Sequence, residues 1–241
     1  LFYRKLRKDL ESIGFVINPY DVCCANKMIN GKQFTVLWHV DDLKISHMES
    51  LQIDKFIAWA KRKYEDPGIT KLKPSRGKIY DYLGVTLDYS TPGVLKVYMK
   101  DYIKRMLEDF PYKDQVDKLK KVSSPAAEHL YAVDHKADLL DNKLKEEFHT
   151  AVAKALFLTK KARPDLQPTV PFLCTRVQAP DTDDWKKLLR LYKYLEDTIN
   201  WELIIEVGSD KEKELIIGWY VDAAFAVHAD FKSHTGAVMT L

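Results

Sequence analysis

The stretch QFTVLWHVDDLKIS, residues 33–46, decides the fold. Its first eight residues are rich in β-forming side chains, and Leu43–Ser46 can return as a second strand, with Asp41 and Asp42 at the turn between them. The preceding Asn30-Gly31 pair is a strong tight-turn signal. This part of the chain is therefore predicted to form an antiparallel meander.

Helices are predicted before and after the meander in the sequence. Residues 1–13 place apolar side chains at three- and four-residue intervals, and residues 50–64 do the same, with cations near the C-terminal end. A second hairpin is expected from Tyr80–Tyr89 and Val94–Met99, because Thr91-Pro92-Gly93 supplies turn residues between them. A short helix is expected to follow at about 103–110.

The remainder of the chain is predicted to be mostly helical. Residues 111–141 hold few periodic apolar positions and are the best linker candidate. Helices are predicted over about 142–160, 166–177 and 182–197, the last with Thr182 as its N-cap. Three strands are predicted at the end, where Glu202–Val207 pairs with Glu214–Val221 around Gly208-Ser209-Asp210 and Gly236–Leu241 begins a third.

Composition bounds the class of protein. The 241 residues are 46% hydrophobic and 30% charged with a net charge of +3, which excludes a disordered or collagen-like chain. Charged residues break every apolar run, so no membrane span is expected, and the charged first ten residues do not read as a signal peptide. Three cysteines without a CxxC pair favour a reducing, intracellular compartment. Because the chain opens on Leu1 and closes on Leu241 inside a strand-like run, we expect it to continue at both ends.

Asp41-Asp42 is the sharpest candidate for chemistry. Adjacent carboxylates repel each other, and two divalent cations that clamp a phosphoryl group would be a reason to hold them together. Mg²⁺ prefers carboxylate oxygen and retained water, so such a site needs few protein ligands. Taken alone, however, an Asp-Asp turn is more often an exposed connection between strands with no chemical role.

The order of elements resembles the palm of a reverse transcriptase. In that family a [YF]-x-D-D box is followed by an FLG-type primer-grip hairpin, which Tyr82-Leu83-Gly84 resembles. Residues 151–165, AVAKALFLTKKARPD, resemble the G-x-L-x-Y-L-x-x-x-T-R-P-D segment of Ty1/copia retrotransposon polyproteins. Lys193-Tyr194-Leu195 with Thr198 is similar to the R-Y-L-K-G-T segment of the same class. Residues 218–223 and 232–236 resemble the G-Y-S-D-A-D-W-A and R-K-S-T-S-G segments that open its ribonuclease H domain.

The resemblance implies roles for particular residues. Asp41 would be the metal-binding carboxylate of the polymerase box, with Asp42 its neighbour, and Asp222 would be the first metal-binding carboxylate of ribonuclease H. Tyr82, Leu83 and Gly84 would form the primer grip. The sequence also departs from the family pattern at three positions, where it has His39 for the box aromatic, Ala224 for the second Asp of D-A-D, and Ala162 for the Thr before Arg163.

The resemblance also implies a fold and an organisation. The class is α+β, with a partial reverse-transcriptase palm sheet and flanking helices, a helical thumb or connection, and the beginning of a ribonuclease H-like mixed sheet. The palm with its primer-grip hairpin would occupy residues 1–110, the linker and helical thumb or connection 111–200, and the first ribonuclease H strands 201–241.

The implied activity is RNA-directed DNA polymerisation, a nucleotidyl transfer assisted by Mg²⁺, with Mn²⁺ as a possible substitute. The partners would be an RNA or DNA template with primer, deoxynucleoside triphosphates and the remainder of the polyprotein, which includes the fingers and the rest of ribonuclease H. The location would be cytoplasmic, in a virus-like particle. Both metal sites need carboxylates beyond these 241 residues, so the chain alone is expected to be inactive. The oligomeric state stays open.

Two alternatives remain from the sequence. Residues 55–78 hold eight Lys and Arg against two acids, which could track a phosphate backbone, or could be a solvated helix face and loop. The chain could therefore be a non-catalytic nucleic-acid-binding remnant of a decayed or domesticated retroelement. A different two-metal phosphodiesterase built on Asp41-Asp42 ranks last, because it leaves the collinear downstream segments unexplained.

Overall fold

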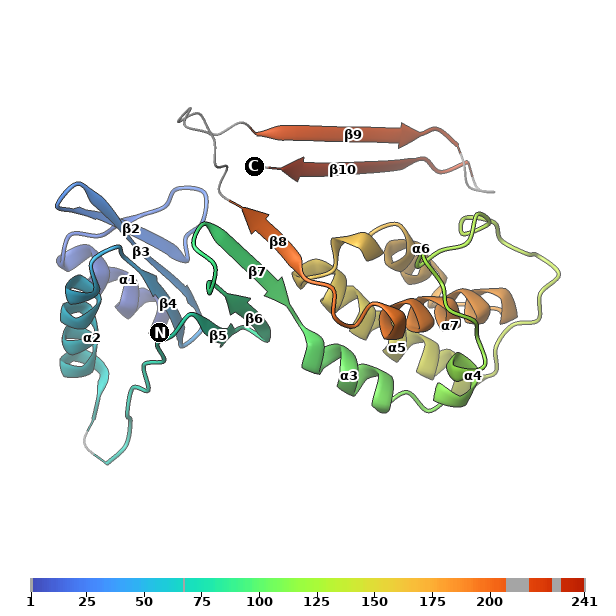
Figure 1. Ribbon diagram of the computed structural model, residues 1–241, viewed down its shortest axis with the longest axis horizontal. Coiled ribbons are helices and arrows are strands. Elements are labelled where there is room, and N and C mark those ends of the chain that lie inside the picture. The colour runs from blue at the N-terminus through green and yellow to red at the C-terminus, as the bar shows by residue number, and fades with distance from the viewer. Residues whose placement is uncertain (1, 67, 207–216, 227–230, 241) are drawn as a thin grey trace. The chain divides into compact units, whose positions relative to one another are not determined.

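The computed structural model describes residues 2–66, 68–206, 217–226 and 231–240. It contains 39% helix and 25% strand, and its sheets are antiparallel wherever their strand pairing is defined, so the fold class is α+β. The chain divides into two compact units, Leu1–Leu83 and Gly84–Leu241, here called the N-terminal and C-terminal units (Figure 1). The division falls inside residues 1–110, which the family resemblance assigns to the palm.

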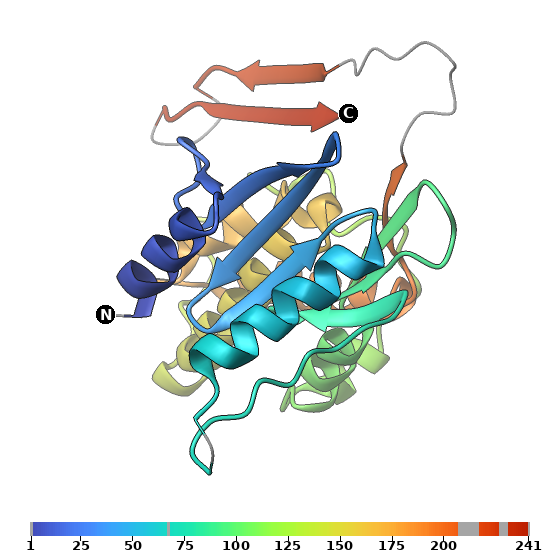
Figure 2. The ribbon, with the colours of Figure 1, turned by 90° about the vertical axis from the view of Figure 1, so that its left-hand side faces the viewer.

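The N-terminal unit is a four-stranded antiparallel sheet covered on one face by two helices (Figure 2). Its elements are α1 (Phe2–Ser12), β1 (Val16–Ile17), β2 (Cys24–Ile29), β3 (Lys32–His39), β4 (Asp42–Ser46), α2 (Ser50–Tyr64) and β5 (Ile79–Tyr82), and the four sheet strands follow the order β1-β2-β3-β4. The meander and both helices predicted from the sequence are confirmed.

Strand β3 connects the sequence pattern to the core. Phe34, Val36 and Trp38 alternate along it and are buried with residues of α1 and α2, whereas the residues between them lie on the opposite face. Asn30 and Gly31 join β2 to β3 with φ angles of 52° and 73°, as in a type I′ turn. The turn fixes the register, and the register places the apolar set of β3 beneath the helices.

Asp9 ties the two helices of this unit together. Its carboxylate accepts a hydrogen bond from Tyr64 Oη at 2.8 Å and pairs with Lys63 and Lys5, each at 3.1 Å. Partial burial opposes the charged form, but the hydrogen bonds from these three residues outweigh it and hold the pKa of Asp9 below its ordinary value. The contribution of Asp9 to stability is therefore present above the ordinary Asp pKa of about 3.9 and is lost as the pH falls below it.

Asp9→Asn is expected to destabilise the N-terminal unit by about 1–2 kcal/mol at neutral pH, because the hydrogen bond to a charged acceptor and two ion pairs weaken together. The difference from the wild type should shrink as the wild-type carboxyl protonates in acid. Hydrogen exchange of α1 and α2 amides at several pH values measures both effects. Asp54→Asn, which removes an exposed ion pair to Arg76, is the matched control. An equal loss at every pH would contradict this role for Asp9.

The C-terminal unit is built around a helical core. Its helices are α3 (Lys100–Glu108), α4 (Lys113–Asp117), α5 (Asn142–Lys161), α6 (Thr169–Arg176) and α7 (Thr182–Asp197), with a 3-10 turn at Pro164–Leu166. Its strands are β6 (Val85–Asp88), β7 (Val94–Tyr98) and β8 (Leu203–Glu206), followed by the antiparallel pair β9 (Gly218–Ala224) and β10 (His234–Thr240). Residues 111–141, expected to be a linker, bury Val116 and Leu130 in this core.

The pairing predicted for the strand at Glu202–Val207 is wrong. β8 pairs with β7 in an antiparallel register from Val94↔Glu206 to Val97↔Leu203, and β9 pairs with β10. Glu202, just before β8, adds two ion pairs to this arrangement, since its carboxylate bonds Lys100 at 2.9 Å and Lys96 at 3.2 Å. The predicted turn at Gly208-Ser209-Asp210 lies outside the described residues.

The start of α7 also differs from the prediction. Asp181, not Thr182, is the N-cap, and it forms a capping box in which Asp181 Oδ1 accepts from the Asp184 backbone N–H at 2.8 Å and Asp184 Oδ2 accepts from the Asp181 N–H at 3.1 Å. Arg176 bonds both carboxylates. A carboxylate buried beside an arginine suits the cap better than a hydroxyl does, since it satisfies the guanidinium as well as the backbone.

Candidate functional site

The turn between β3 and β4 presents the two predicted carboxylates. His39↔Asp42 is the last pair of the ladder, so Val40 and Asp41 form a two-residue turn. Val40 has a φ of 55°, a conformation that is rare for a β-branched residue. Strain of this kind costs about 1–3 kcal/mol and clusters at functional sites, because the surrounding structure must impose it. The strained tip is therefore a candidate site on geometric grounds as well.

The carboxylates of the turn are open to a cation. Asp41 and Asp42 are both exposed, and neither side chain forms a hydrogen bond or an ion pair with the described parts of the chain. Trp38 and Leu43 pair across the ladder and belong to the core, so His39 and Asp42, one residue further along each strand, lie on the face away from the helices. Carboxylate oxygens with free lone pairs are the donors that Mg²⁺ and Mn²⁺ prefer.

Tyr82, predicted for the primer grip, lies within electrostatic range of this turn. It ends β5 and is half-buried, and its pKa is raised first by that burial and then by the charges of Asp42, Cys23 and Asp21. The N-terminal unit thus holds, within electrostatic range of each other, one residue predicted for the polymerase box and one predicted for the primer grip. Leu83 and Gly84 follow with φ angles of 52° and 78°, a tight turn directly after Tyr82.

Asp21 is a neighbour of Tyr82 that sequence reasoning missed. It lies in the loop between β1 and β2, where its Oδ1 accepts a hydrogen bond from the Cys23 N–H at 2.9 Å. The signal in the sequence, Asn18-Pro19-Tyr20-Asp21, is a turn pattern that carries no indication of a distant partner. Asp21 adds negative potential beside Tyr82 but makes no third ligand: among the described residues no three His, Cys, Asp or Glu side chains converge as a metal site.

Asp222, the predicted ribonuclease H carboxylate, belongs to the C-terminal unit. It is exposed in the middle of β9, where its Cα pairs with Gly236 of β10. Among the described residues, Asp222 belongs to no group of three or more His, Cys, Asp or Glu side chains that could hold a metal ion. Asp222 is thus a candidate ligand of the C-terminal unit, whereas Asp41 and Asp42 belong to the N-terminal unit.

Two of the family-like segments meet in the C-terminal unit. Arg163, from the segment at residues 151–165, is buried and forms a bidentate ion pair with Asp165, with nitrogen–oxygen distances of 2.8 and 2.9 Å. It also donates to the Thr198 hydroxyl at 2.7 Å and to the Thr198 carbonyl at 3.2 Å. Arg163 thus locks the end of α5 to the C-cap of α7, so Arg163-Pro164-Asp165 acts here as a structural clamp.

The basic segment at residues 55–78 is partly neutralised. Arg76 bonds Asp54 at 2.6 Å and Lys63 bonds Asp9 at 3.1 Å. By contrast, Lys71, Lys73 and Lys78 are exposed and form no ion pair with any described residue. These three lysines precede β5 and leave a cationic stretch on the N-terminal unit that an external anion could bind.

No protein-family model matches the chain, and no solved structure matches it. Within the described ranges, no helix is long and apolar enough to cross a membrane.

Proposed function

We propose that the N-terminal unit is the part of a Ty1/copia-like reverse-transcriptase palm that carries the polymerase carboxylates, and that the chain derives from an RNA-directed DNA polymerase. One observation carries the proposal. The strained turn at Val40 presents Asp41 and Asp42 with free carboxylate oxygens, and Tyr82 lies within electrostatic range of Asp42. A plain connecting turn has no need of a β-branched residue at positive φ or of two adjacent unpaired anions.

The reaction joins a primer 3′-hydroxyl oxygen to the α-phosphorus of a nucleoside triphosphate and breaks the bond to the β-phosphate, which leaves as pyrophosphate. Asp41 and Asp42 would hold divalent cations, which supply Lewis-acid stabilisation of phosphoryl charge when bound. The β3–β4 ladder holds both carboxylates at one tip. Tyr82, with its raised pKa, stays a neutral phenol that can donate a hydrogen bond to a primer sugar or phosphate.

The described residues supply two carboxylates at this turn and no convergent third ligand. A cation bound by two carboxylates and water is held more weakly and with less defined geometry than one in a full site. We therefore propose that this chain alone binds Mn²⁺ at the turn without catalysing nucleotide addition. The turn lacks the further metal ligands that catalysis requires.

Mn²⁺ titration tests the metal centre. Paramagnetic broadening is expected first at the amides of residues 39–43, which adjoin the two carboxylates, and at Tyr82, on which the charge of Asp42 acts. Asp41→Asn and Asp42→Asn should each weaken Mn²⁺ binding by about tenfold or more, since each removes an anionic ligand. Asp101→Asn, an exposed carboxylate in the first turn of α3, is the matched control. Equal broadening in the wild type and the double variant would rule the centre out.

Primer extension on an RNA template tests separately whether the chain alone is inactive as a polymerase. No incorporation is expected with Mg²⁺ or Mn²⁺. Robust incorporation that is lost in Asp41→Ala would show the site to be complete and would overturn the proposed inactivity, while leaving the metal centre supported.

The second candidate function is a non-catalytic nucleic-acid-binding remnant. It is favoured by the exposed Lys71, Lys73 and Lys78, which form no ion pair with described residues, and by His39 in place of the family's aromatic residue. This function predicts binding to an RNA–DNA duplex that persists in a chelator, falls steeply with salt and is unchanged by Asp41→Asn. Such a result, together with an absence of Mn²⁺ broadening, would favour the nucleic-acid-binding remnant over a polymerase-derived metal centre at the turn.

A further inference from the structure

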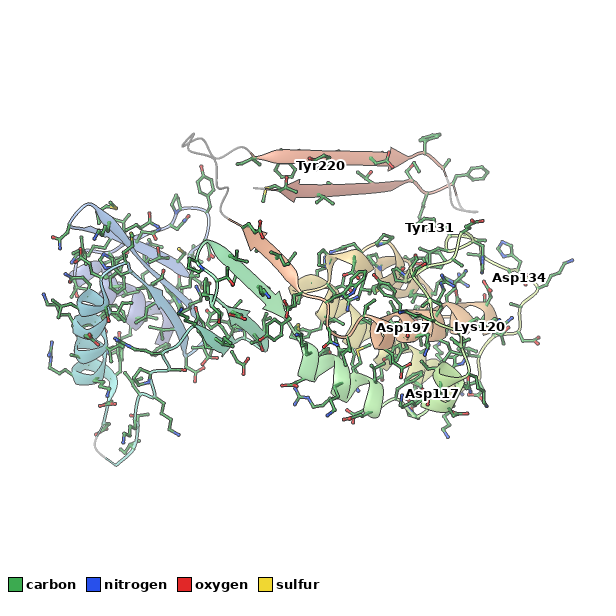
Figure 3. All side chains as sticks on the ribbon, in the orientation of Figure 1. Asp117, Lys120, Tyr131, Asp134, Asp197 and Tyr220 are labelled. Carbon is green, nitrogen blue, oxygen red and sulfur yellow. The ribbon has the colours of Figure 1, made fainter. Side chains whose placement is uncertain are left out.

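A pocket of about 220 Å³ lies in the C-terminal unit, between α7 and the segment that precedes α5. One wall is a single face of α7, because Asp183, Lys186, Lys187 and Arg190 follow helical spacing. The other wall is largely apolar and comes from the stretch 125–130, which leads into the loop marked by Tyr131 and Asp134 in Figure 3. Neither the metal turn nor the family-like motifs use any residue of this pocket.

The charges in the pocket do not cancel. Lys187 is engaged inside the fold, because its ammonium bonds Asp183 at 2.9 Å and donates to the Ala132 carbonyl at 2.6 Å. This pairing neutralises the single carboxylate of the pocket wall. Lys186 and Arg190 are left as two cations on the same wall, and neither forms an ion pair within the described part of the chain.

Arg190 gives the stronger indication of a bound anion. Its Nε is buried and has no hydrogen-bond acceptor among the described residues. A buried donor on a charged group that has lost water and gained no partner is costly, so nearly all such groups in folded proteins are paired. A guanidinium presents its donors in a rigid fork that matches the oxygens of a phosphate or carboxylate. Arg190 lines the pocket, so an oxyanion there lies within reach of the guanidinium fork.

We propose that this pocket binds a phosphate group, whose oxygens accept hydrogen bonds from Arg190 and Lys186. A phosphate fits better than a carboxylate, because two uncancelled cations favour the greater charge and larger number of acceptor oxygens of a phosphate. The apolar wall formed by Ala126, Ala127 and Leu130 suits the carbon atoms of an attached sugar or base. The phosphate could belong to a nucleic-acid strand or to a free nucleotide, and the two share this chemistry.

Inorganic phosphate is the first probe, titrated at constant ionic strength and followed by NMR. The Arg190 Nε–H signal and the amides of residues 126–130 are expected to shift. Arg190→Gln should weaken binding by about tenfold or more, and Lys186→Gln by a smaller factor, because the first removes a partly buried fork and the second an exposed ammonium. dTTP and an oligothymidylate of about ten nucleotides then separate the two sources, and the tighter ligand identifies the natural one.

Arg105→Gln is the matched control, because it makes the same substitution at an exposed position of α3. It should leave phosphate binding unchanged. An equal loss in Arg105→Gln and Arg190→Gln, or an absence of shifts at 126–130, would overturn the proposal. If Arg190→Gln does not fold, Lys186→Gln decides, since an exposed residue can be replaced without disturbing the core and must still weaken binding.

Discussion

Arg163→Ala is expected to lower the free energy of unfolding of the C-terminal unit by about 3 kcal/mol, at the lower end of the range for breaking a buried ion pair. Arg163 is 2% exposed, and its guanidinium is satisfied by Asp165 and by both oxygens of Thr198. Its carbon Cζ also lies 5.5 Å from the Tyr194 ring centre and 5.7 Å from that of Trp201. In the variant, Asp165 keeps access to water and can be rehydrated, whereas the Thr198 oxygens lose their buried donors. The partial rehydration is why we expect about 3 kcal/mol and not the upper end of the range.

Hydrogen exchange of α5 and α7 amides measures this loss, because Arg163 joins the ends of those two helices. Arg163→Lys should cost about 2 kcal/mol, since an ammonium keeps the charge but cannot make the bidentate pair and both Thr198 bonds at once. Arg105→Ala removes an exposed arginine and should cost little. Equal effects of Arg163→Ala and Arg105→Ala would show that the clamp contributes no stability.

The sequence predicted elements whose partners are near in the chain. The alternation of Phe34, Val36 and Trp38 indicated a half-buried strand, and the Asn30-Gly31 turn indicated where its partner lies, so the meander followed from local rules. The partner of β8 did not follow, because β7 is about a hundred residues away, and no local pattern marks either the ladder or the ion pairs from Glu202 to Lys96 and Lys100. The turn residues after β8 favoured a local hairpin instead.

The candidate site was predictable only in part, for a similar reason. Asp41 and Asp42 are adjacent and follow a strand, so their place at a turn is visible in the sequence. The positive φ of Val40 is not, because valine is one of the residues least expected there. Asp21 and Arg190 were not predicted, because only the folded chain distinguishes them. Asp21 acts on Tyr82, which is distant in sequence, and Arg190 has a buried Nε without an acceptor among the described residues.

Phe34→Ala is expected to destabilise the N-terminal unit by about 3–5 kcal/mol, the usual cost of removing a buried phenyl ring. Phe34 is 1% exposed and lies at the centre of an aromatic cluster, with ring centres 5.4 Å from Phe15, 5.4 Å from Phe56 and 5.3 Å from His47. Hydrogen exchange of β2, β3 and β4 amides measures the loss. Phe157→Ala on α5 makes the same truncation at a ring that is 41% exposed, and should cost far less.

The same substitution should weaken Mn²⁺ binding at Asp41 and Asp42, although Phe34 lies six residues before Val40, the first residue of the turn. Val40 keeps its strained φ only while the β3–β4 ladder imposes it, and the ladder is held in register by the apolar side chains beneath the helices. A loosened β3 lets Val40 relax, and the turn then no longer holds the two carboxylates in one fixed arrangement. Mn²⁺ titration of folded Phe34→Ala measures this coupling. Wild-type Mn²⁺ affinity in a clearly destabilised variant would show instead that the turn sets its own geometry.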